Sequence, residues 1–125
     1  MTVYHTLAEL AQTMEEKQAD PVILLDVHGC TLVSDYFLIC ACSNVPQIKA
    51  VHAAAKEKLS QQKTTIFGEE GDASSGWMLI DCSTIIIHIF SSELYRFYNI
   101  EDIWADAKQI NWKAKYELHQ KNNCT

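Results

Sequence analysis

Apolar residues recur at helical spacing over residues 3–18, which predicts an amphipathic helix that ends before Pro21. Two continuous apolar runs follow at 22–27 and 36–41, and short runs rich in β-branched and aromatic residues predict buried strands. Helical spacing returns after residue 44, and one apolar side indicates a helix packed on a sheet. The residues on that side are Val45, Ile48, Val51, Ala55 and Leu59.

The second half of the chain reads mainly as strands. Residues 64–67 predict a short edge strand, and the glycine-rich and acidic residues 68–76 predict a loop. Two apolar runs, 77–80 and 85–90, flank a short polar break and therefore predict a hairpin. The second run has no polar alternation except at His88, which indicates a central strand covered on both faces.

The chain becomes polar after its last helical pattern. Residues 93–98 predict a short helix, and apolar residues at helical spacing continue to Ala107. We therefore expect one domain over 1–107 and a polar C-terminal extension over 108–125 that is helical or frayed. The order of elements, with one helix crossing between strands, predicts an α/β fold: a small mixed β-sheet of about five strands with helices packed on it.

Charge and cysteine content limit the partners of this chain. Among 125 residues, 16 are acidic and 10 basic, a net charge of −6, which argues against direct nucleic-acid recognition and favours a basic protein surface. No apolar run approaches the ~20 residues that span a bilayer, and the N-terminus lacks the plan of a signal peptide, so we expect no membrane contact. Five cysteines form no paired framework, which favours reduced thiols in the cytoplasm.

Cysteine and histidine residues offer one candidate metal set. Cys40, Cys42, Cys82 and His88 could supply four ligands, but structural zinc sites use two paired knuckles, and a single Cys-x-Cys is a weak signal. Free cysteines that pack as small core residues are the better interpretation. We therefore expect no metal and no cofactor.

Three aspartates near strand ends form a second candidate site. Asp26, Asp35 and Asp81 could bind Mg²⁺ for nucleotidyl transfer, because α/β proteins place reactive groups at strand ends. A phosphate-binding loop is missing from the sequence, and aspartates often accept backbone hydrogen bonds in turns. A nucleotidyltransferase-like, Mg-dependent enzyme that uses these three residues is the alternative hypothesis.

His88, Asp35 and Ser43 have structural interpretations. A lone polar group in a buried strand needs a hydrogen-bond partner, so we predict that His88 is bonded in the core and orients the hairpin. Activation of the nearby Cys82 or Ser83 by His88 is the weaker alternative. Asp35 and Ser43 are assigned to turns, with Ser43 or Asn44 as the cap of the second helix.

Aromatic and acidic residues are interleaved in the C-terminal half. Tryptophan and tyrosine are frequent interface anchors, and a surface that combines them with carboxylates suits a basic partner. The same aromatic residues are about equally well explained as core residues between helix and sheet. They are Trp77, Tyr95, Tyr98 and Trp104, close in sequence to Glu93, Glu101 and Asp102.

Several motifs together resemble the ribosomal silencing factor family, also called Iojap-related. They occur in order over about 7–107, and no single one is decisive. The motifs are Leu25-Asp26-Val27, Ser34-Asp35-Tyr36-Phe37-Leu38-Ile39-Cys40, Gln47, Glu70-Gly71, Leu79-Ile80-Asp81, His88-Ile89-Phe90 and Arg96-Phe97-Tyr98-Asn99-Ile100-Glu101-Asp102-Ile103-Trp104.

This resemblance implies a fold similar to nucleotidyltransferases without their catalytic residues, and a function that is not enzymatic. Members of the family bind large-subunit protein fourteen on the inter-subunit face of the large ribosomal subunit. They thereby block joining of the small subunit, and assistance in subunit maturation is a further expectation. From residue type and resemblance together we predict a partner surface, and an apolar surface of this kind also predicts a weak homodimer of the free protein. The surface comprises Trp77, Asp81, Tyr98, Glu101 and Trp104, with Glu70 as a weaker member.

The chain departs from the family pattern at three places. Ala41-Cys42 replaces the common Thr-Gly after the second strand, and Pro46 stands where Arg or His often precedes the helix glutamine. Ser83-Thr84 replaces Gly-Asp in the hairpin turn, which changes the turn type and removes one carboxylate. We therefore expect that affinity for the ribosome differs while the core motifs are kept.

Overall fold

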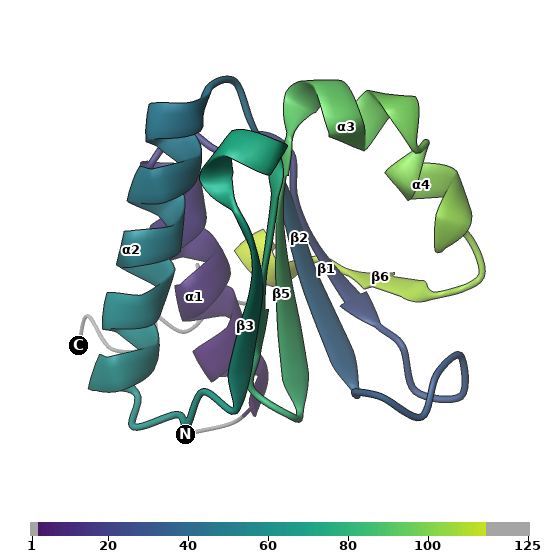
Figure 1. The fold of residues 1–125 in the computed structure, drawn as a ribbon. Coiled ribbons are helices and arrows are strands. Elements are labelled where there is room, and N and C mark those ends of the chain that lie inside the picture. The colour runs from purple at the N-terminus through teal and green to yellow at the C-terminus, as the bar shows by residue number, and fades with distance from the viewer. Residues whose placement is uncertain (1–2, 115–125) are drawn as a thin grey trace.

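The computed structural model describes residues 3–114 of the chain (Figure 1). Helices and strands are interspersed along it. The elements are α1 (Val3–Glu16), β1 (Val22–Asp26), β2 (Tyr36–Cys42), α2 (Val45–Gln61), β3 (Gly68–Asp72), the short 3₁₀-helix η1 (Ala73–Ser75), β4 (Trp77–Asp81), β5 (Ile85–Ser91), α3 (Ser92–Phe97), α4 (Ile100–Ile103) and β6 (Lys108–Ile110).

The strands form one mixed sheet in the order β3-β4-β5-β2-β1-β6. Only β2 and β5 run parallel among these pairs, and the other neighbours are antiparallel. All seven residues of β2 are buried, as expected for a central strand with both faces covered. The predicted α/β class is therefore confirmed, and the described residues contain six strands where the sequence indicated about five.

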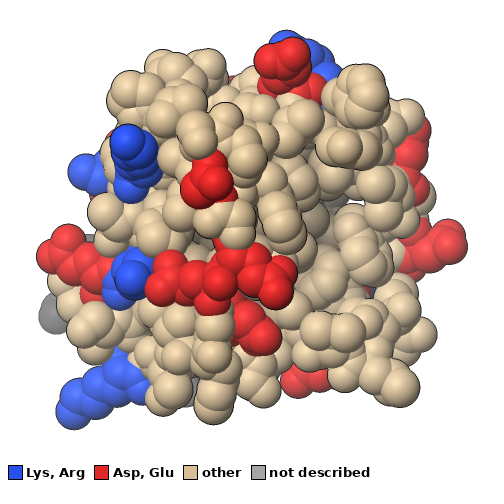
Figure 2. Space-filling model, in the orientation of Figure 1, with Lys and Arg blue, Asp and Glu red and all other residues tan. Residues whose placement is uncertain are grey.

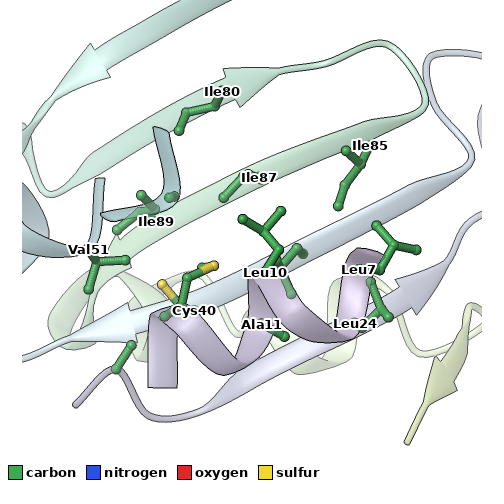
Figure 3. Close-up of a cluster of buried hydrophobic side chains, with 14 of the residues drawn as sticks. Leu7, Leu10, Ala11, Leu24, Cys40, Val51, Ile80, Ile85, Ile87 and Ile89 are labelled. Atoms are coloured by element: carbon green, nitrogen blue, oxygen red, sulfur yellow. The ribbon is translucent and has the colours of Figure 1, made fainter. Parts of the chain in front are cut away.

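One face of the sheet, called here the helix face, is covered by α1 and α2 (Figure 1). Figure 3 shows Leu7 and Leu10 of α1 directed toward Ile85 and Ile87 of β5. Burial of each large aliphatic side chain contributes about 1.5–3 kcal/mol, so this core is the main source of stability. Asn44 caps α2 by accepting a hydrogen bond from the backbone N–H of Gln47 at 2.8 Å.

The opposite face, called here the second face, is covered only in part. The two helices that lie on it, α3 and α4, have six and four residues, too few to cover the whole sheet. They pack over β5, β2 and β1 and leave the side chains of β4 half-buried. The core residues on this face are Leu25, Val27, Phe37, Ile39, Ala41, Ile86, Tyr95 and Ile100.

The edge strand β3 corrects two sequence predictions. Residues 64–67 are not a strand, and the predicted loop at 68–76 contains β3, which pairs with β4. The reason is that every residue of β3 is exposed, so the strand has no hydrophobic signal. Gly71 has a φ of +78°, and a Cβ atom there would lie 2.2 Å from the carbonyl oxygen of Trp77. Glycine is therefore required for the close pairing of these two strands.

The region after residue 107 corrects a third prediction. Lys108–Ile110 is β6, paired with β1, and not a helical or frayed extension. Trp112 is buried, and its indole N–H donates a hydrogen bond to the carbonyl oxygen of Val22 at 2.9 Å. The remainder of the predicted extension, residues 115–125, lies outside the described residues. Within the described range, no helix has the length and apolar character needed to cross a membrane.

Candidate functional site

The partly covered second face contains an aromatic hollow of about 450 Å³. Strand register builds it, because Trp77 of β4 lies opposite Phe90 of β5, and Leu79 lies opposite His88. Residues paired across antiparallel strands project from the same face, so these side chains share one surface. The lining residues, called here the aromatic hollow, are Ser75, Trp77, His88, Phe90, Leu94 and Tyr98.

His88 lies among aromatic rings on the floor of this hollow. Its ring centroid is 4.9 Å from that of Phe37 and 6.0 Å from that of Phe90, with the second ring nearly parallel. Neither ring nitrogen has a hydrogen-bond partner among the described residues, and the same holds for the indole nitrogen of Trp77. The predicted hydrogen-bonded core histidine is therefore wrong, because aromatic rings surround His88 on both sides. Burial lowers the pKa of His88 from 6.5 to about 4, so the ring is neutral at pH 7.

Carboxylates lie beside the aromatic hollow on β3. Glu70 pairs in register with Leu79 and Asp72 with Trp77, so both project from the second face. Hydrogen bonds from Ser74 and from the backbone of Ser75 lower the pKa of Asp72 and keep it ionised.

Glu69, which precedes Glu70 in β3, pairs in register with Ile80 and projects to the helix face. There its carboxylate lies 3.0 Å from the ammonium of Lys56 and 2.7 Å from the ring of His52. Figure 2 shows acidic side chains gathered in a band that crosses this side of the molecule over β3. Because no ion pair is found for Glu70 in the described part of the chain, its charge is available to a partner.

A second hollow, of about 370 Å³, lies between β1 and α4. Trp104 and Glu101 belong to it, and the Tyr95 hydroxyl donates a hydrogen bond to Glu101 Oε1 at 3.0 Å. Burial and the Glu101 carboxylate raise the pKa of Tyr95, so this hydroxyl keeps its proton. The lining residues, called here the α4 hollow, are Pro21, Val22, Ile23, Leu25, Ile39, Ile100, Glu101, Trp104, Ala105, Ala107 and Gln109.

The structure divides the predicted partner surface into three parts. Trp77 and Tyr98 line the aromatic hollow, whereas Glu101 and Trp104 line the α4 hollow. Asp81 lies at the end of β4, where its side chain accepts a hydrogen bond from the backbone of Ser83 at 2.8 Å. A row of aromatic rings connects the two hollows, since the Phe37 ring lies 4.8 Å from Trp104 and 4.9 Å from His88.

Ser43 and Asp35, the two residues that the sequence assigned to turns, lie beside α2 and β2. Asn44 is the cap of α2, and the backbone N–H of Ser43 donates a hydrogen bond to Gln47 Oε1 at 2.6 Å. The Gln47 side chain also donates a hydrogen bond to the carbonyl oxygen of Lys17 at 3.0 Å, so it links the start of α2 to the segment that follows α1. Asp35 lies in the loop before β2, and its backbone N–H donates a hydrogen bond to Thr84.

His28 is a residue that the sequence reasoning missed. Its Nδ1 lies 2.6 Å from Asp26 Oδ1, and its Nε2 lies 3.1 Å from Asp35 Oδ1. The hydrogen bond to Asp26 raises the pKa of His28, and hydrogen bonds from His28 lower the pKa of Asp26. Two of the three aspartates are thus held together by a histidine, while Asp81 is engaged in its own turn. The described residues contain no group of three side chains suited to a metal ion, so the geometry gives the magnesium hypothesis no support.

Three cysteines, two in β2 and one in the turn between β4 and β5, are core residues. Cys40 and Cys42 both belong to the core on the helix face, as expected for alternate residues of one strand. Cys82 is buried as well, and burial raises its pKa to about 11. The prediction of small core thiols is confirmed for these three residues.

Comparison with known proteins identifies relatives along nearly the whole chain. A family model described as "Ribosomal silencing factor during starvation" matches residues 1–124. The ribosomal silencing factor RsfS of Bacillus subtilis is 31% identical over 97 residues, which is 78% of this chain and 82% of the relative. The chloroplastic protein Iojap of Arabidopsis thaliana is 28% identical over 114 residues, 91% of this chain and 48% of the relative.

Solved structures show the same fold. A crystal structure of a protein from Bacillus halodurans matches with a TM-score of 0.71 and 29% identity, over 84% of this chain and 96% of that one. A protein from Chromobacterium violaceum matches with a TM-score of 0.77 and 23% identity, over 84% and 88% of the two chains. The mixed sheet with its two helical layers is therefore shared with experimentally determined structures.

Proposed function

This chain belongs to the ribosomal silencing factor family, and we propose that it represses translation by binding the large ribosomal subunit at its inter-subunit face. In this proposal the contact is large-subunit protein fourteen, and the bound domain prevents the small subunit from joining. The observation that supports the proposal most is the aromatic hollow with carboxylates beside it on the open part of the second face.

The chemistry of this surface suits a basic protein. Trp77 and Tyr98 offer large aromatic areas that gain energy when a partner excludes water from them. Glu70 and the ionised Asp72 lie beside them and can pair with lysine or arginine of the partner. A net charge of −6 attracts a basic ribosomal protein and opposes non-specific contact with rRNA.

The proposed mechanism is steric and requires no chemical step. A chain of 125 residues has a radius of gyration of about 14 Å, so the bound domain would project roughly 30 Å from the subunit surface. Glu70 and Trp77 belong to neighbouring strands of one hydrogen-bonded sheet, which gives the domain a fixed orientation once it is bound. Such a domain would occupy the space that the small subunit needs. Assistance in large-subunit maturation would use the same contact.

Co-sedimentation with isolated large subunits, small subunits and intact ribosomes tests this proposal. We expect the protein to sediment with large subunits and to reduce their reassociation with small subunits. Trp77→Ala should weaken binding at least tenfold, the loss of about 1.4 kcal/mol or more expected of a central aromatic anchor. Glu70→Lys should weaken binding through like-charge repulsion.

Glu57→Lys is the matched control for the charge change. Glu57 is exposed on α2, on the other side of the sheet, and this variant makes the same change in net charge. It should bind large subunits nearly as well as the original protein. If the Trp77→Ala and Glu70→Lys variants bind large subunits as tightly as the original protein, the proposed surface is overturned. If the original protein binds no ribosomal particle, the proposed function is overturned.

A further inference from the structure

We propose that the α4 hollow binds a small amphipathic amine, a compound with an aromatic or aliphatic body and one ammonium group. Its volume of about 370 Å³ lies within the range of small-molecule sites. One wall comes from β1 and β2 through Ile23, Leu25 and Ile39, and the other comes from the segment around α4. Ligand-sized space between a sheet and a short helix is thus present at a position separate from the aromatic hollow.

The walls of the α4 hollow select an apolar body. Ile23 is half-buried in one wall with the buried Leu25 and Ile39 behind it, and Trp104 contributes an indole ring that is half-buried. A ring or short alkyl chain that fills this space removes apolar surface from water on both partners.

A single charge in the lining selects the ammonium. Among the described residues that line the α4 hollow, Glu101 alone is charged, and one of its oxygens accepts the hydrogen bond from Tyr95. The raised pKa of Tyr95 keeps that hydroxyl protonated, so Tyr95 is the donor of this hydrogen bond and Glu101 accepts it. The second oxygen of Glu101 has no salt bridge within the described range, and a ligand ammonium can pair with it.

Neighbouring groups strengthen this selection. Cations are attracted to the faces of indole rings within about 6 Å, so Trp104 favours an ammonium as well as an apolar body. Lys108 of β6 lies opposite Asp26, whereas its neighbour Gln109 lies opposite Leu25 and lines the hollow. Because successive strand residues project to opposite faces, the lysine charge is directed away from the hollow. An anionic ligand would therefore meet a carboxylate with no compensating cation among the lining residues that the structure describes.

Protein-observed NMR with a set of matched probes tests the proposal. The probes are 2-phenylethylamine, its neutral analogue 2-phenylethanol and the anion phenylacetate, and the signal is the indole N–H of Trp104, assigned with Trp104→Phe. We expect a saturable shift of this signal by the amine with a dissociation constant in the low millimolar range. The alcohol should bind roughly threefold to tenfold more weakly, and the anion more weakly still.

Glu101→Gln removes the charge and keeps an oxygen that can accept from Tyr95, so it should abolish the preference for the amine. Asp102→Asn is the matched control, because Asp102 is an exposed acid on the same helix that does not line the hollow. That variant should keep the preference.

Equal affinity for amine and alcohol, a preference that survives Glu101→Gln, or a shift confined to the Trp77 indole would each overturn the site. The experiment contains no ribosomes, so its outcome is independent of the proposed docking function.

Discussion

Replacement of His88 by phenylalanine should stabilise the fold at neutral pH. His88 has two ring nitrogens without partners in the described structure, and a buried polar side chain left unsatisfied costs about 1–3 kcal/mol. The neighbouring ring of Phe90 is nearly parallel to it, at an interplanar angle of 4°, so another flat ring fits the same position. The larger ring also has space, because His88 lines the aromatic hollow. We expect a rise in the free energy of unfolding of about 1–3 kcal/mol.

The same substitution should remove part of the pH dependence of stability. The folded pKa of His88, about 4, lies below the ordinary value of 6.5, so the unfolded chain binds this proton more tightly. The contribution of His88 to the free energy of unfolding is therefore complete above about pH 6.5. It falls as the pH is lowered from about 6.5 to about 4, and it is constant below about pH 4. The full difference corresponds to about 3 kcal/mol, of which about 2 kcal/mol is lost by pH 5.

Urea unfolding of both proteins at pH 7 and pH 5 measures these two effects. Carboxylates with lowered pKa values, such as Glu69 and Asp72, also lose their contribution as the pH falls through their folded pKa values. They are common to both proteins, so the difference between the variant and the original chain isolates His88. That difference should grow by about 2 kcal/mol between pH 7 and pH 5. A variant that is no more stable at pH 7, and that keeps the original pH dependence, would show that His88 is solvated or hydrogen-bonded.

Three further substitutions have separate expected results. Trp112→Phe should lower the free energy of unfolding by about 1 kcal/mol in thermal melting, because it removes the hydrogen bond to Val22; an unchanged melting temperature would contradict the role of Trp112 in closing the sheet edge. Gly71→Ala should accelerate amide hydrogen exchange in β3, because its Cβ would clash with the Trp77 carbonyl oxygen; unchanged exchange would refute the requirement for glycine. We also propose that the free protein forms a weak homodimer through its exposed aromatic residues, and Tyr98→Glu should then abolish the concentration dependence of its light scattering; a constant mass in the original protein would rule the dimer out.

The sequence predicted those parts of the fold that carry a strong hydrophobic period. β2, β5 and α2 have continuous or helical apolar patterns, and the structure contains them close to the expected positions. β3 escaped prediction because a fully exposed edge strand is held by backbone hydrogen bonds to β4 and has no apolar face. β6 escaped because it has three residues and only Ile110 is buried.

The candidate site was predictable in composition but not in arrangement. Residue type identified Trp77, Tyr98, Glu101 and Trp104, yet strand register and the position of the short helices divide them between two hollows. His28 had one available signal, its spacing of two residues from Asp26 at a strand end, which brings the two side chains together. The second carboxylate at His28 belongs to Asp35, at the far end of the loop before β2, and such a contact depends on tertiary structure.

The cost of His88 to the fold has a consequence for the proposed docking surface. His88 and Trp77 have buried ring nitrogens without a partner among the described residues, which breaks a rule that buried polar groups otherwise follow. Such exceptions occur mainly at functional sites. A partner segment laid in the aromatic hollow could offer carbonyl oxygens to the Trp77 indole N–H and to the N–H of the neutral His88 ring, and a donor to the other His88 nitrogen. A phenylalanine ring can form neither bond of His88. His88→Phe should therefore bind large subunits more weakly while it unfolds at higher urea concentration, a separation of function from stability. Co-sedimentation at matched concentrations of folded protein measures the first effect. Undiminished binding by the stabilised variant would mean that the ring nitrogens of His88 face no partner, and that Trp77 and Tyr98 anchor the contact through their apolar surface alone.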